Sequence, residues 1–198
     1  MARQRLIPKR SVRGAALLTM ACLGAVVAPG ACLAIETEAS EAAVQAAYLF
    51  NFARFTEWPS GTFPSKNTPL MYCLLGRRDA LANAMGSLND RSVQGHPLRF
   101  SQPERLEDAR NCHLVFVAEP DTRRRAQALQ FLAAQPTLTV SDIEGFTHQG
   151  GMIRLMQVGT RLRFEINRTD TQKAGLRLSA DLLNLATAIV EPETGASR

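Results

Sequence analysis

Acidic residues are absent from the first 35 positions of the chain, since the first one is Glu36. The same stretch is rich in basic residues, all within the first thirteen positions: Arg3, Arg5, Lys9, Arg10 and Arg13. Without these five, 18 of the 23 Lys and Arg remain against 18 Asp and Glu, so the rest of the chain is close to neutral. The net charge of +5 therefore gives no support for a nucleic-acid-binding protein, which needs a basic patch on its folded surface.

Long apolar runs are also scarce, and the one that occurs follows the basic residues, from Gly14 to Ala28. Roughly fifteen apolar residues are fewer than the ~20 that a membrane-spanning helix needs, which disfavours an uncleaved anchor. Small residues come next and end at Ala34. This order is typical of a secretory signal peptide. We predict that residues 1–34 form one, cleaved after Ala34 or alternatively after Ala31, and that the protein is exported to the periplasm.

Cysteines are few, and only Cys73 and Cys112 remain once the predicted signal peptide is removed. In an oxidising compartment an isolated pair is most simply interpreted as one disulfide. Two buried free thiols are the alternative. A redox-active pair is less favoured because there is no Cys-x-x-Cys spacing to lower a thiol pKa.

The remaining 35–198 segment is long enough for one domain with a sizeable core. Apolar runs of strand length span 69–76, 93–100, 112–118 and 137–141, and helical patterns span 43–55, 79–85, 103–109 and 122–134. Strands that alternate with helices predict a mainly parallel sheet. Continuous apolar runs such as 112–118 are typical of a sheet covered on both faces.

The end of the chain has a different pattern. Segments 152–158 and 161–167 alternate between apolar and polar residues and are separated by Gly159 and Thr160, which predicts an antiparallel hairpin. Residues 176–190 are predicted to form an apolar helix, with Ser179 as a cap. The predicted fold class is therefore α/β: a single domain with a mixed, mainly parallel sheet, helices on both faces, and a C-terminal antiparallel hairpin plus helix.

Catalytic constellations are lacking. His96, His113 and His148 lie in separate segments without metal-ligand spacing, so a zinc site is not predicted. No Gly-x-Ser-x-Gly nucleophile elbow occurs. The candidate acids and bases are Glu57, Asp142, Glu144 and Glu165, and each is more typical of a solvated or ion-paired carboxylate. The sequence predicts no catalytic residues, no metal and no cofactor.

Binding residues are the remaining candidates. Trp58, the sole tryptophan, stands next to Pro59, where an aromatic corner could anchor a partner or pack in the core. Arg154, Arg161, Arg163 and Glu165 are predicted to lie on the outward face of the hairpin. That charged face could recognise a partner or simply contact water, and the pattern does not separate the two.

Several segments together resemble the YfiR family of exported bacterial proteins. They are Tyr48–Pro59 with its Phe-Asn-Phe-Ala-Arg-Phe core, 112–117, Gly150–Ile153 leading to 161–167, and the closing 174–179 with 182–186. The resemblance implies a periplasmic α/β domain that works by binding. It would repress the periplasmic sensor portion of an inner-membrane diguanylate cyclase, and thereby control cyclic di-GMP and biofilm formation.

The resemblance also implies an OmpA-like outer-membrane lipoprotein that sequesters the repressor, and a second copy of the chain is a further candidate partner. The family's structural disulfide would fall on Cys73 and Cys112. A second cysteine pair of better-known relatives, near Gly145 and Gly151, is missing here, so redox control through that pair does not transfer. Two alternatives stay open: a periplasmic small-ligand sensor without a cyclase partner, and a hydrolase with an unrecognised site.

Overall fold

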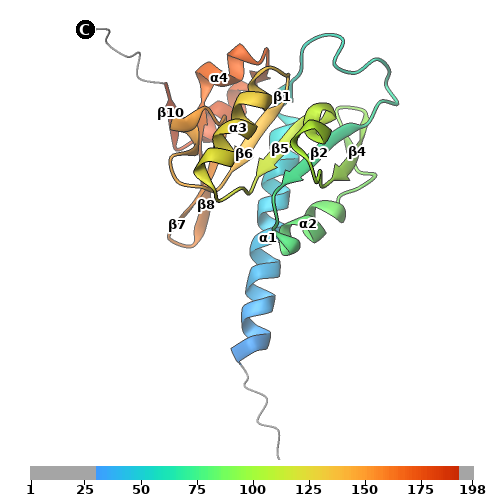
Figure 1. Cartoon of the computed structure of the whole chain (residues 1–198). Coiled ribbons are helices and arrows are strands. Elements are labelled where there is room, and N and C mark those ends of the chain that lie inside the picture. Colours follow the sequence, from blue (N-terminus) through green and yellow to red (C-terminus); the bar gives the residue numbers. More distant parts are fainter. Residues whose placement is uncertain (1–29, 192–198) are drawn as a thin grey trace, which may run out of the picture.

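The structure, a computed structural model of the chain, describes residues 30–191, with side chains from residue 37 onward. Most of the predicted signal peptide therefore lies outside the described residues. An eight-stranded sheet forms the centre of the molecule, in the order β10-β8-β7-β6-β5-β2-β4-β3 (Figure 1). Its strands are β2 (Leu70–Leu75), β3 (Ser92–Val93), β4 (His96–Ser101), β5 (Leu114–Val117), β6 (Leu138–Ser141), β7 (Ile153–Val158), β8 (Arg161–Asn167) and β10 (Ala188–Val190).

Strands β4, β2, β5, β6 and β7 are parallel, while β8 is antiparallel to β7 and β3 to β4. The helices are α1 (Gly30–Arg54), α2 (Asp79–Gly86), α3 (Thr122–Ala133), α4 (Arg168–Lys173) and α5 (Ala180–Leu185), with 3-10 helices η1 (Leu106–Asn111) and η2 (Phe146–Gln149). A separate two-stranded ribbon pairs β1 (Thr56–Glu57) with β9 (Arg177–Leu178). The predicted α/β single domain with a mainly parallel sheet is confirmed.

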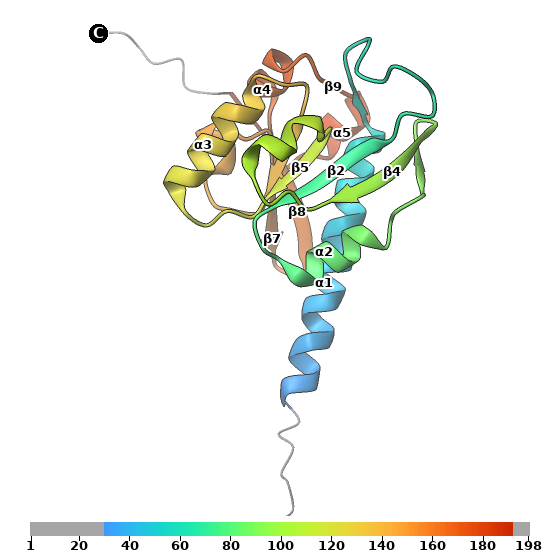
Figure 2. The same cartoon turned by 45° about the vertical axis from the view of Figure 1, so that its right-hand side comes forward.

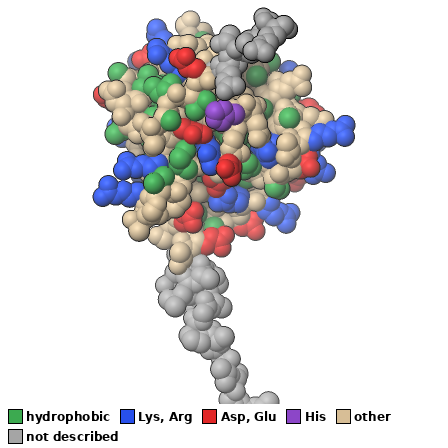
Figure 3. Space-filling model, turned by 90° about the vertical axis from the view of Figure 1, so that its left-hand side faces the viewer, with side chains coloured by type: hydrophobic (Ala, Val, Ile, Leu, Met, Phe, Trp, Pro, Cys, Tyr) green, Lys and Arg blue, Asp and Glu red, His purple; other side chains and the backbone are tan. Residues whose placement is uncertain are grey.

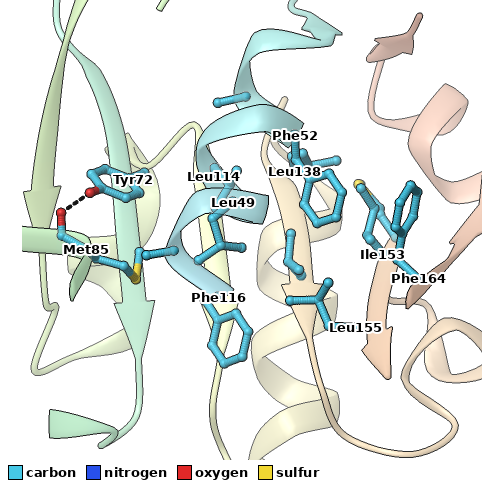
Figure 4. Close-up of a cluster of buried hydrophobic side chains, with 14 of the residues drawn as sticks. Leu49, Phe52, Tyr72, Met85, Leu114, Phe116, Leu138, Ile153, Leu155 and Phe164 are labelled. Carbon is cyan, nitrogen blue, oxygen red and sulfur yellow. Dashed lines mark hydrogen bonds between the residues drawn. The ribbon is translucent and has the colours of Figure 1, made fainter. Parts of the chain in front are cut away.

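Both faces of the central strands are covered, so every residue of β5 and β6 is buried, including the polar Thr139 and Ser141 of β6. Leu114 and Phe116 of β5 belong to a core cluster with α1 and α2, which Figure 4 shows. The alternate residues Val115 and Val117 belong to a second cluster with η1, η2 and α3. Figure 2 shows α1 and α3 on opposite sides of the sheet.

Helix α1 buries one stripe of side chains. Its members recur at helical spacing: Ala42, Ala46, Leu49, Phe52 and Ala53. Ala43 and Ala47, which the wide apolar pattern would also place inside, are exposed. Residues 37–41 are exposed as well, so the packed part of the domain begins at Ala42. No helix in the described part of the chain is both long and apolar enough to cross a bilayer.

The predicted helix over 176–190 is wrong. Ser179 does cap a helix, accepting a hydrogen bond from the Leu182 backbone N–H at 3.2 Å, but α5 ends at Leu185. The next residues form β10, which pairs in parallel with β8. Long-range strand pairing thus overrides the local apolar pattern, and the β-branched residues Ile189 and Val190 suit a strand.

The predicted strand over 93–100 is divided. Gln94 and Gly95 both have positive φ angles, 53° and 86°, and make a two-residue turn between β3 and β4. Positive φ at both central positions is the requirement of a tight hairpin turn. Helix α4 and η2 were not predicted, because each is a short turn capped by local hydrogen bonds with little apolar periodicity.

Candidate functional site

The Trp58 corner is a packed aromatic cluster. The Trp58 ring meets the rings of Phe63 and His113 edge to face, with centroids 5.9 and 6.4 Å apart. The ring is half-buried against the main core cluster, and its Nε1 is a buried donor without a hydrogen-bond partner among the described residues. The geometry therefore gives Trp58 a packing role, and its contact with a partner stays a prediction.

Two histidines lie on either side of Phe63, a feature that the sequence did not indicate. The Phe63 ring stacks on His96 with centroids 4.1 Å apart, and on His113 with centroids 4.6 Å apart. The Met71 backbone N–H donates to Nδ1 of His113 at 2.9 Å. Burial, assisted by the nearby His96, lowers the pKa of His113 to about 4 even though backbone hydrogen bonds oppose the shift. His113 is therefore neutral at pH 7.

The hairpin residues divide into a covered base and an open tip. Arg154 and Glu165 lie opposite each other on β7 and β8, with Arg154 Nη1 3.7 Å from Glu165 Oε1 and side chains only 22% and 12% exposed. Thr147 of η2 donates to Glu165 at 2.6 Å. Nε of Arg154 is buried and has no hydrogen-bond partner among the described residues. These two residues share the predicted face but do not form an open charged surface, because η2 lies beside them.

The tip of the same face is open. We call it the hairpin tip and define it by Met156, Val158, Arg161 and Arg163, since Met156 pairs with Arg163 and Val158 with Arg161 across the two strands. Both arginines are exposed and make no ion pair with a described residue, and Val158 is 53% exposed. Figure 3 views the molecule from its side and shows basic, acidic and apolar side chains interspersed, without a patch of one sign.

The structure does not bring the Trp58 corner and the hairpin tip together. The corner packs against His113, at the amino end of the parallel strand β5. The turn after Val158 lies at the carboxyl end of β7, which runs in the same direction. The two candidate surfaces are thus at opposite ends of the sheet.

Three of the four candidate carboxylates are engaged in ion pairs. Asp142 Oδ2 lies 2.8 Å from Nη1 of Arg78, which also contacts Gln45 of α1. Glu57 Oε2 lies 3.0 Å from Nη2 of Arg177 on β9. Together with Glu165, three of the four therefore have structural partners. No group of three or more His, Cys, Asp and Glu side chains within residues 37–191 is arranged to hold a metal ion.

The disulfide prediction is confirmed. Cys73 of β2 and Cys112, just before β5, are bonded, with Cα atoms 6.0 Å apart. Both are buried in the second core cluster beside Leu129 and Phe146. The bond joins two neighbouring strands beneath α3, so it belongs to the core and presents no accessible redox centre.

The structure is that of a disulfide-bonded α/β domain with a mainly parallel sheet. The chain belongs to the family described as DUF4154, YfiR/HmsC-like, whose model matches residues 42–187. That match begins where the packed part of α1 begins. The family is periplasmic, regulatory and non-catalytic, and membership points to a regulator of cyclic di-GMP signalling.

Among solved structures, the chain is similar to a conserved domain protein from Vibrio cholerae O1 biovar El Tor. Sequence identity is 13% and the TM-score is 0.40. The match covers 61% of this chain and 55% of the Vibrio chain, so it spans about half of that protein's length.

Proposed function

We propose that the protein is exported to the periplasm, where it binds the periplasmic sensor portion of an inner-membrane diguanylate cyclase and represses it. The family match over residues 42–187 is the observation that carries this proposal. The buried Cys73–Cys112 bond supports it, because disulfides persist in oxidising compartments such as the periplasm. An OmpA-like outer-membrane lipoprotein would relieve the repression by binding the same repressor.

A repressor must bind the inactive state of its target more tightly than the active state, since equal affinity for both would shift no population. The hairpin tip is the surface that we assign to this contact. Its exposed Val158 is flanked by two guanidinium groups that are unpaired among the described residues, and arginine is one of the residue types enriched in binding hot spots. The guanidinium fork suits bidentate contact with carboxylates of a partner.

The test is capture of the purified cyclase sensor portion by the mature protein, followed by titration. Reversing both tip charges, Arg161→Glu with Arg163→Glu, is expected to weaken binding at least 10-fold. The matched control reverses two arginines that are also exposed and unpaired among the described residues, Arg123→Glu with Arg168→Glu, and should leave binding unchanged. Both double variants change the net charge equally, so a general electrostatic effect would weaken both.

Unchanged affinity in the tip variant, with the wild type binding, would exclude the hairpin tip as the contact surface. Absence of capture by the wild type would contradict the proposed function itself. Thermal melting of each variant verifies that the domain is folded, and little change is expected because surface substitutions usually alter stability by no more than about 0.5 kcal/mol.

A further inference from the structure

A cavity of about 790 Å³ opens at the carboxyl ends of three neighbouring strands, β4, β2 and β5. Its floor includes Leu75 and Gly76 at the end of β2, and one wall is formed by Arg124, Gln127 and Ala128 of α3. These three helix residues are spaced i, i+3 and i+4 and therefore share one helix face. The volume lies within the 300–1,000 Å³ that small-ligand pockets occupy.

The chain topology places the cavity where ligands of such sheets bind. From β2 the chain passes through α2 to β4 on one side, and from the adjacent β5 it passes through α3 to β6 on the other side. Connections that diverge from adjacent parallel strands leave a crevice at their carboxyl ends. Gly76 at this floor has a φ of +103°, and a Cβ there would lie 3.0 Å from the Ala118 carbonyl carbon, so only glycine lets the ends of β2 and β5 approach so closely.

Charged side chains of both signs line the crevice without pairing. They are Arg77, Arg124, Asp79, Glu104 and Glu119. None of the five forms an ion pair with a residue in the described range, although seven ion pairs occur elsewhere. Only Glu119 accepts a hydrogen bond, from the Asp121 backbone N–H at 3.0 Å. Two guanidinium forks and at least two carboxylates are thus free to bind a ligand.

We propose that this crevice binds a short peptide with free termini. Arg77 and Arg124 would hold its carboxylate, for which the guanidinium fork is well shaped, and the acidic side chains would hold its ammonium group. The volume suits roughly two to four residues better than a single amino acid. A nucleotide fits less well, because three carboxylates would repel its phosphates and the lining offers no aromatic ring on which a base could stack.

The test is to measure the affinity of the mature protein for trialanine, N-acetyl-trialanine and trialanine amide by titration calorimetry. Free trialanine is expected to bind, and capping either terminus should weaken binding at least 10-fold, since each cap removes one of the two charges. Arg124→Ala should weaken the binding of trialanine by a similar factor. It should hardly weaken the binding of trialanine amide further, because the amide already lacks the carboxylate that Arg124 would hold. Arg123→Ala is the matched control, because Arg123 is exposed on the same helix but does not line the crevice.

The ammonium contact is tested by Glu104→Gln, with Glu107→Gln as a control outside the crevice. Glu104→Gln should weaken the binding of trialanine at least 5-fold and leave the binding of the N-acetyl peptide unchanged. The proposal would be overturned if trialanine did not bind at millimolar concentration, or if free and capped peptides bound equally. It would also be overturned if inorganic phosphate bound the crevice with the same affinity as the peptide. The titration involves no cyclase, so its failure leaves the proposed repressor function untouched.

Discussion

Breaking the Cys73–Cys112 bond should remove a large part of the stability of the domain. The bond closes a loop with a sequence separation of 39 residues. In the chain-entropy model, closing such a loop in the unfolded state is worth about 4 kcal/mol. For a domain of this size, each kcal/mol corresponds to about 2–4 °C in Tm, so reduction should lower Tm by about 8–16 °C.

The assay is equilibrium unfolding in urea of oxidised protein and of protein reduced while unfolded and then refolded under reductant. Reduction is preferable to substitution because the two thiols retain the buried volume of Cys73 and Cys112, both of which lie in the core. The predicted mature chain contains no other cysteine, so reduction acts on this bond alone. A difference below about 1 kcal/mol would refute the loop-closure reasoning.

Two further predictions concern the folded core. Burial lowers the pKa of His113 to about 4. Between pH 6.5 and 4 the unfolded chain therefore binds a proton that the folded chain does not. The free energy of unfolding should fall as the pH falls through this window. Because solvent screens the half-buried ring, the free energy of unfolding should fall by only about 2 kcal/mol across this window. His113→Asn retains an acceptor for the Met71 N–H and should flatten this part of the pH profile, as measured by urea titration at each pH. An unchanged slope in the variant would rule out His113 as the source of the pH dependence. Gly151→Ala should destabilise by about 1–3 kcal/mol, because the new Cβ would lie 2.2 Å from a ring carbon of the fully buried Phe146. Gly86→Ala, whose Cβ would meet only Phe100 at 3.8 Å, is the control, and equal Tm values for the two variants would contradict the packing argument.

The central strands could be predicted from the sequence because burial on both faces leaves a continuous apolar run, as in β2 and β5. The hairpin could be predicted because one face is polar and the turn contains Gly159. Strand β10 could not, since its three residues adopt a strand only through pairing with β8, more than twenty positions earlier. Local pattern does not contain that information.

Side-chain clusters depended on strand order in the same way. His96 and His113 meet Phe63 only because β4 and β5 lie on either side of β2, which places their amino ends near the 58–69 loop. The crevice at the carboxyl ends of β4, β2 and β5 likewise exists only because these three strands are neighbours in the sheet. Arg154 and Glu165 share the hairpin face that the alternating pattern predicts, but η2 covers them, and the sequence does not indicate this because η2 has no clear apolar period.

In the proposed function, an exported protein lowers cyclic di-GMP by contact with the periplasmic part of a cyclase. The most direct measurement is intracellular cyclic di-GMP in cells that lack the gene and are complemented either by the full chain or by a chain without residues 1–34. Cyclic di-GMP is expected to be high in the deleted cells, to fall with the full chain, and to stay high with the truncated chain that remains in the cytosol. Equal restoration by both chains, or no change on deletion while the cyclase is active, would show that the protein does not repress a cyclase from the periplasm.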